Sequence, residues 1–235
     1  MTHAKILIVA TSAAKMTNGE QTGLWLEELT TPYYAFADAG AEVTLASVAG
    51  GAIPVDPRSM APEGENDASV ERYLKDKATQ AIVADTPAAA GFVDQIDTFD
   101  AIFLPGGHGT MFDYPGSDDL TRLIEGFDRA GKLVSAVCHG PAGLVSAKTS
   151  TGAPLVEGRT VAAFTDSEEH AVGLQDTGPF LLETKLRERG AKISAAPDFQ
   201  VHAVRDGGVV TGQNPAAAQR TAALVMQALS EKVAA

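Results

Sequence analysis

Short apolar runs that end in glycine or serine alternate with longer helical patterns along this chain, and no other feature constrains the fold as much. Four such runs, typical of buried β-strands, lie at residues 5–13, 41–50, 99–107 and 131–140. Residues 22–38 and 117–130 instead carry apolar side chains at helical spacing. Continuously apolar strands separated by helices indicate an α/β fold with a parallel sheet covered on both faces. Ligand chemistry is then expected at the carboxyl ends of the strands.

The remaining segments extend this pattern. Residues 160–166 are a further candidate strand, and residues 199–215 predict two short strands around the turn at Asp206. A closing helix is expected from Pro215 onward. Residues 55–90 are polar and punctuated by prolines, which we interpret as an excursion from the sheet. We therefore expect one domain over residues 1–235.

Charge and cysteine content limit the partners and the cellular compartments that this chain is expected to have. The formal net charge of -12 argues against binding to nucleic-acid backbones or anionic membranes, which require basic patches. A single cysteine excludes an internal disulfide and gives no sign of an oxidising compartment. The N-terminal apolar run is short and interrupted by a charge, unlike a signal peptide, and no stretch approaches a membrane span of about 20 apolar residues. These features predict a cytoplasmic protein.

The single cysteine, Cys138, lies between the apolar run "LVSAV" and the segment "HGPAGL". A strand that ends abruptly and continues through glycine into a helix with Pro141 near its start predicts a strand–turn–helix. The residue at such an apex is strained, and a helix N-terminus beside it favours the thiolate. The alternative is that Cys138 is simply a small buried apolar residue.

Several motifs together resemble the ThiJ/PfpI superfamily, relatives of the class I glutamine amidotransferases. The segments that carry the resemblance are "TGLWLEEL" (22–29), "DAIFLPGGHGTMFDYP" (100–115), "AVCHGPAGL" (136–144), "AFTD..E" (163–169) and "VVTGQNPAAA" (209–218). They are most similar to the branch of heat-shock-associated, glutathione-independent glyoxalases (glyoxalase III). The resemblance implies a flavodoxin-like three-layer α/β sandwich with a mostly parallel central sheet, which agrees with the strand pattern.

The resemblance also implies that a glutamate of the first helix faces the cysteine. Glu27 and Glu28 are both candidates. At 100° per residue, Glu28 falls within the apolar stripe that contains Leu24 and Leu29, whereas Glu27 falls outside it. A carboxylate on a buried face is costly unless it is paired or protonated, which favours Glu28 as the functional residue and Glu27 as a solvated acid.

A cysteine–histidine–acid triad is a second implication of the resemblance. It assigns His139 as the histidine and Glu169 as the acid that orients it, with Glu168 and Asp166 as the other candidates in "FTDSEEH". The same run has the form of a helix start, so Asp166 or Ser167 could instead cap the helix, with Glu168 or Glu169 in its first turn.

The run "PGGHG" (105–109) lacks the lysine of a phosphate-binding loop and the spacing of a dinucleotide site. We interpret it as part of an oxyanion hole made by the backbone N–H groups of Gly107 and His139. His108 either contacts substrate or faces solvent. No histidine spacing indicates a metal site, and three histidines are expected to be surface or structural residues: His3, His170 and His202.

The reaction implied by the resemblance is the conversion of methylglyoxal or glyoxal to the hydroxy acid, without glutathione or any other cofactor. Cys138 would form a hemithioacetal with this small dicarbonyl substrate, and Glu28 would move the proton. The resemblance also implies a homodimer. Three alternatives remain: an amidase, peptidase or deglycase on the same fold; a holdase chaperone; and a redox sensor that acts through oxidation of Cys138.

Overall fold

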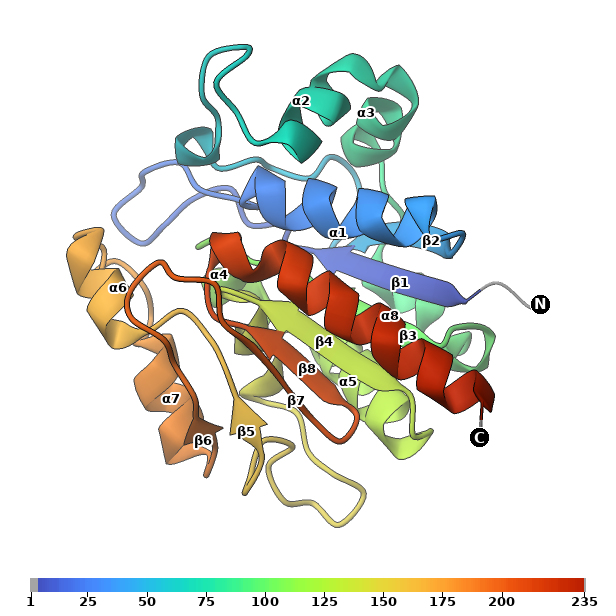
Figure 1. Ribbon diagram of the computed structural model, residues 1–235. Coiled ribbons are helices and arrows are strands. Elements are labelled where there is room, and N and C mark those ends of the chain that lie inside the picture. The colour runs from blue at the N-terminus through green and yellow to red at the C-terminus, as the bar shows by residue number, and fades with distance from the viewer. Residues whose placement is uncertain (1–3, 235) are drawn as a thin grey trace.

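Six strands form the central sheet of the computed structural model, which describes residues 4–234 (Figure 1). The strands are β1 (Lys5–Ala10), β2 (Glu42–Ser47), β3 (Ala101–Leu104), β4 (Leu133–Val137), β7 (Ala203–Asp206) and β8 (Val209–Gly212). Their order is β2-β1-β3-β4-β8-β7, and every neighbouring pair is parallel except β7 with β8. This is the mostly parallel, flavodoxin-like sheet that the strand pattern predicts.

Helices cover both faces of this sheet, which explains why its strands are apolar on both sides. Ile6 and Ile8 of β1 belong to the core that includes buried residues of α1 (Leu26–Asp38) and α8 (Ala218–Ala234). Leu7 and Val9 point to the opposite core, which contains the buried side chains of α5 (Asp118–Arg129). The alternation follows from the two-residue period of a strand, and the three layers are visible in Figure 1.

Local sequence signals set the ends of α5 close to the predicted helix at 117–130. Ser117 caps the helix by accepting a hydrogen bond from the Leu120 N–H at 3.2 Å. Gly131 follows the last turn with φ of 66°, a conformation that glycine adopts without strain. Between these ends, the buried face is formed by Leu120, Leu123, Ile124 and Phe127.

Two sequence-based boundaries are wrong. The predicted strand at 160–166 is only β5 (Thr160–Val161), which pairs with β6 (Lys192–Ile193) in a separate two-stranded sheet. Beyond Val161 the backbone binds other partners: the Ala162 N–H donates to Thr211 Oγ1, and the Phe164 N–H donates to the Cys138 carbonyl. The first helix begins at Leu26 instead of residue 22, because Leu24 forms a backbone bridge with Val55.

The excursion at residues 55–90 contains two short helices, α2 (Ala68–Lys75) and α3 (Lys77–Ala84), and lies over α1 (Figure 1). The Ser69 hydroxyl shares hydrogen bonds of 2.7 Å with the hydroxyls of Thr30 and Thr31, which join α1 to α2. The remaining helical elements are η1 (Pro57–Ser59), η2 (Ala89–Phe92), η3 (Ile96–Thr98), α4 (Thr110–Asp113), η4 (Gly140–Leu144), α6 (Asp166–Ala171), α7 (Leu182–Glu188) and η5 (Pro215–Ala217). No helix within residues 4–234 has both the length and the apolar content needed to cross a bilayer.

Candidate active site

Cys138 stands immediately after β4 in a strained backbone conformation, with φ of 60°. Non-glycine residues seldom adopt this left-handed region, and when they do they cluster at functional sites. Two backbone hydrogen bonds hold the conformation: the Cys138 N–H donates to the Gly212 carbonyl at 3.0 Å, and its carbonyl accepts from the Phe164 N–H at 2.9 Å. The strained apex expected from the sequence is therefore present, and its side chain is only 3% exposed.

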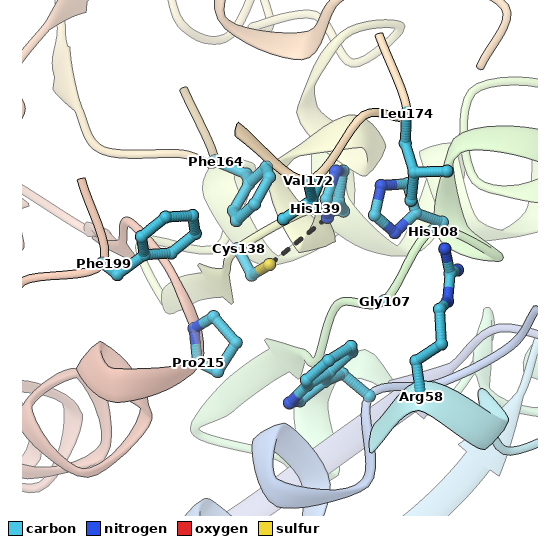
Figure 2. A pocket seen from close by; sticks show the side chains of 11 residues that line it. Arg58, Gly107, His108, Cys138, His139, Phe164, Val172, Leu174, Phe199 and Pro215 are labelled. Carbon is cyan, nitrogen blue, oxygen red and sulfur yellow. Dashed lines mark hydrogen bonds between the residues drawn. The ribbon is translucent and has the colours of Figure 1, made fainter. Parts of the chain in front are cut away.

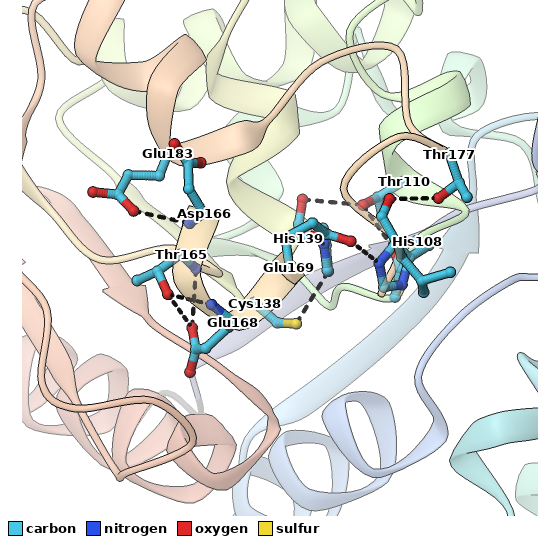
Figure 3. A network of polar contacts seen from close by, with 12 residues as sticks. His108, Thr110, Cys138, His139, Thr165, Asp166, Glu168, Glu169, Thr177 and Glu183 are labelled. Carbon is cyan, nitrogen blue, oxygen red and sulfur yellow. Dashed lines mark hydrogen bonds and ion pairs between the residues drawn. The ribbon is translucent and has the colours of Figure 1, made fainter. Parts of the chain in front are cut away.

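A chain of polar contacts leads away from the thiol (Figure 3). Cys138 Sγ lies 3.2 Å from His139 Nδ1, and His139 Nε2 lies 2.8 Å from Glu169 Oε2. The second carboxylate oxygen, Oε1, lies 2.7 Å from Nε2 of His108. Glu169 is thus shared by two histidines, one on each oxygen. The structure brings together the three residues that the resemblance implied, and adds His108 to them.

The charges in this chain follow from burial and hydrogen bonding. Burial, with a contribution from the adjacent His108 ring, lowers the pKa of His139 to about 4. Burial alone would raise the pKa of Glu169, but hydrogen bonds from His108 and His139 more than offset this and hold it well below its usual range. At neutral pH a neutral His139 therefore donates its Nε2–H to an ionised Glu169. Its Nδ1 lone pair is left facing Cys138, where it can accept the thiol proton.

Glu28 approaches the same thiol from α1. It is 0% exposed, and its Oε2 accepts the Gly106 N–H at 2.8 Å. Burial raises the pKa of Glu28 well above its usual range, although the Cys138 thiol and the Gly106 N–H lower it in part. Glu28 Oε1 has no hydrogen-bond partner among the described residues. The Cys138 thiol nevertheless lies close enough to Glu28 to lower the pKa of the carboxyl in part. Glu27 lies outside this arrangement, as the helical spacing predicted, but it is half-buried instead of fully solvated, and burial raises its pKa.

The expectation that a helix N-terminus favours the thiolate is wrong. The segment after Cys138 is a five-residue 3-10 turn, η4, and not an α-helix with an extended dipole. Burial, followed by the nearby Glu28 carboxyl, raises the pKa of Cys138 well above its usual range. The thiol is therefore protonated at rest, and it needs a neighbouring base to become a nucleophile.

The N–H groups of Gly107 and His139 lie on two adjoining loops. Thr110 Oγ1 connects these loops, since it contacts the Gly107 carbonyl at 2.9 Å and the His139 carbonyl at 3.0 Å. Gly107 has φ of 102°, and a Cβ there would lie 2.3 Å from the Gly23 carbonyl oxygen, so only glycine fits. Within residues 4–234 neither N–H has a hydrogen-bond acceptor, which leaves both available to a ligand oxygen.

These groups open into a cavity of about 290 Å³ (Figure 2). Its lining consists of Trp25, Arg58, Gly107, His108, Cys138, His139, Phe164, Val172, Leu174, Phe199 and Pro215. The motifs identified the polar residues around Cys138, but they did not identify Arg58. They did not identify Phe164, Phe199 or the aliphatic residues of the wall, because nothing in a single sequence distinguishes an apolar residue that faces a cavity from one that faces the core.

A sequence profile of the DJ-1/PfpI family matches residues 21–228. The chain belongs to the DJ-1/PfpI family. Glyoxalase 3 of Candida albicans is 32% identical over 95% of this chain and 98% of its own. The glutathione-independent glyoxalase HSP31 of Saccharomyces cerevisiae is 31% identical over 97% of this chain and 99% of its own. The X-ray structure of the 24 kDa Rapid Encystment Protein of Francisella tularensis is 36% identical, with a TM-score of 0.91 over 96% of this chain and 99% of that one. The family resemblance inferred from the motifs is confirmed.

The other two acids of this DJ-1/PfpI chain's "FTDSEEH" segment have structural contacts. Thr165 is the N-cap of α6, and Glu168 completes a capping box with it. The predicted helix start is present, with Glu168 and Glu169 both in its first turn, but the cap is Thr165 and not Asp166 or Ser167. Asp166 contacts Thr184 on α7 and accepts its N–H at 3.3 Å. Only Glu169 of the three contacts His139.

The other described histidines do not line the cavity. His170 is exposed and its ring contacts the Asp166 carbonyl, while His202 is half-buried against Ser194. His3 lies outside the described residues. One side-chain nitrogen or carboxylate oxygen from each of His108, His139 and Glu169 lies within 4.8 Å of the others. Histidine and glutamate are residue types that can bind a metal ion. Their hydrogen bonds to one another already account for this proximity.

Proposed function

We propose that this DJ-1/PfpI protein is a glutathione-independent glyoxalase that converts methylglyoxal or glyoxal to the hydroxy acid. The observation that carries the proposal is that one thiol is flanked by two separate proton carriers. His139 with Glu169 lies on one side of Cys138, and the buried Glu28 approaches from α1. Isomerising an oxoaldehyde needs both a nucleophile with its own base and an independent group that moves a carbon-bound proton. The names of the two yeast relatives support the same reaction.

In the first step His139 Nδ1 takes the thiol proton, and Cys138 Sγ bonds to the aldehyde carbon of the substrate. The electron pair of the carbonyl moves to its oxygen, which the N–H groups of Gly107 and His139 are placed to stabilise. Return of the proton from His139 to that oxygen gives a neutral hemithioacetal. Ionised Glu169 stabilises the intermediate imidazolium.

In the second step Glu28, in its ionised form, removes the hydrogen of the former aldehyde carbon as a proton, and the electron pair forms an enediolate with the neighbouring ketone carbon. Glu28 then returns the proton to that second carbon, while His139 takes the hydroxyl proton of the first carbon and passes it to the oxygen of the second. The first carbon is oxidised to a thioester and the second is reduced to an alcohol, so no external oxidant or reductant is needed. The raised pKa of Glu28 suits this role, because the carboxyl must accept a proton and release it at similar cost.

In the third step water attacks the thioester carbonyl, His139 accepts a proton from the water, and the bond to Cys138 Sγ breaks. The sulfur leaves with the electron pair and regains its proton, and the hydroxy acid departs as its carboxylate. We also propose that the protein acts in the cytoplasm as a homodimer that binds neither nucleic acid nor membranes. The net charge of -12 supports the last point.

The test is lactate formation from methylglyoxal without glutathione, measured for the wild type and for Cys138→Ala. We expect lactate from the wild type, and loss of at least a thousandfold in the variant because the covalent path is removed. A wild type that makes no lactate would refute the proposal. Activity on amide or glycated-protein substrates alone would then favour the amidase or deglycase alternative, and client-protein holding that survives Cys138→Ala would favour a chaperone.

A further inference from the structure

The cavity is large and apolar for a substrate as small as methylglyoxal. Its volume of about 290 Å³ is close to the lower end of pockets that bind drug-sized molecules, roughly 300–1,000 Å³. Apart from the polar groups around Cys138 and the single Arg58, the wall consists of aromatic, aliphatic and proline side chains. Methylglyoxal bonded to Cys138 has only one methyl group with which to contact that wall.

Aromatic rings lead from the base of the cavity to its mouth. The Phe164 ring packs on His139 with centroids 4.5 Å apart, and Phe199 follows with its centroid 6.3 Å from that of Phe164. Figure 2 shows both phenylalanines on one side of Cys138. Phe199 remains 45% exposed, and Val172 at the same cavity remains 43% exposed. Covering such apolar surface is favourable, so the mouth can bind an apolar group attached to the aldehyde.

The backbone of Phe199 is constrained in an unusual way. Its φ of 59° lies in the left-handed region, which is a genuine outlier for a bulky side chain. The Phe199 N–H donates to Glu168 Oε1 at 2.8 Å. Glu168 is fully buried, and the same oxygen accepts hydrogen bonds from the side-chain amides of Gln213 and Asn214. A buried carboxylate with this many donors holds the strained residue in place, which points to a purpose for the position of the ring.

We propose that the pocket is built for oxoaldehydes that carry an aromatic or bulky apolar substituent, and that Phe199 determines this specificity by packing against the substituent. The inference rests on the proposed function and adds a substrate class to it. With the aldehyde carbon bonded to Cys138 and its oxygen at Gly107, the substituent extends along Phe164 toward Phe199. Methylglyoxal reacts at the same base of the cavity but does not reach Phe199.

The experiment compares kcat/KM for phenylglyoxal and methylglyoxal in the wild type, Phe199→Gly and Phe199→Tyr. Glycine adopts φ near 59° without strain and keeps the N–H that Glu168 accepts, so Phe199→Gly removes the ring alone. We expect the wild type to prefer phenylglyoxal. We expect Phe199→Gly to lose about tenfold on phenylglyoxal and less than about twofold on methylglyoxal, and Phe199→Tyr to keep the preference.

Val201→Ala is the matched control, because Val201 is 59% exposed on the same segment but does not line the cavity. It should leave both activities unchanged. Equal losses on both substrates in Phe199→Gly, or a wild type that prefers methylglyoxal, would overturn the inference while leaving the proposed function intact. The inference would also be overturned if sedimentation showed that the wild type is a dimer and that Phe199→Gly dissociates it, because a second copy of the chain would then cover the Phe199 ring. Turnover of neither substrate by the wild type would instead refute the proposed function.

Discussion

Replacing Glu28 by Gln separates the proposed role of the buried carboxyl in proton transfer from its role in the structure. Glutamine has the same shape, and its amide oxygen can still accept the Gly106 N–H that Glu28 Oε2 accepts at 2.8 Å. What the substitution removes is the ability to exchange a proton with the substrate carbon. Glu28→Ala is a poorer test, because it opens a cavity and leaves a buried N–H unpaired.

The expected changes in rate and stability follow from the two roles of the Glu28 carboxyl, which are proton transfer to and from the substrate and acceptance of the Gly106 hydrogen bond. A positioned general base contributes about 10²–10⁴-fold to rate, so Glu28→Gln should lower kcat by that amount. Below the ordinary glutamate pKa of 4.5, where the carboxyl is protonated in the folded and unfolded states alike, the free energy of unfolding should change by less than about 1 kcal/mol, since the hydrogen bond and the packing remain. Cys138 should still add to the aldehyde, because His139 and not Glu28 takes the thiol proton in the proposed first step.

The assay follows lactate formation and, in D₂O, the exchange of the aldehyde-derived hydrogen with solvent. Both should fall together in Glu28→Gln, whereas trapping of a Cys138 adduct by mass spectrometry should persist. Glu27→Gln is the matched control on the same helix, since Glu27 is only half-buried and lies outside the site; it should retain activity within about twofold. More than a tenth of wild-type activity in Glu28→Gln would refute the assignment of Glu28 as the base.

Three further predictions concern the pH dependence of stability, the titration of His139 and the space around Gly107. Because the pKa of Glu28 is raised in the folded state, its contribution to stability is full below its unfolded pKa and is lost as pH rises. Glu28→Gln should therefore gain stability relative to the wild type as the pH rises above the ordinary glutamate pKa of 4.5, measured in denaturant titrations. Since burial lowers the pKa of His139 to about 4, the His139 ring should titrate near that value when followed by NMR, and a transition near 6.5 would contradict a neutral resting His139. Gly107→Ala should destabilise the fold by about 2 kcal/mol or more, because the new Cβ would meet the Gly23 carbonyl oxygen at 2.3 Å. Gly19→Ala, also at positive φ but with open space around it, should cost clearly less in the same thermal or chemical unfolding assay.

Much of the fold could be predicted from periodicity alone. An apolar run such as β1 can be buried only between two covered faces, so the parallel sheet and its helices follow from the alternation of patterns. The helical spacing of α1 also placed Glu28, and not Glu27, on the buried face. The boundaries at Leu24 and at residues 160–166 failed because partners distant in sequence, the Val55 backbone and the Thr211 side chain, replaced the local pattern.

The sequence by itself determined the sheet, the cysteine at a strand end and the set of titratable residues that could serve it. Only the tertiary structure decided their states and surroundings. A pKa depends on burial and on neighbours from other elements, which is why Cys138 is a protonated thiol and why Glu169 is shared between His139 and His108. The apolar wall that includes Phe199 also exists only after folding, because it is assembled from loops whose separate sequences carry no common pattern.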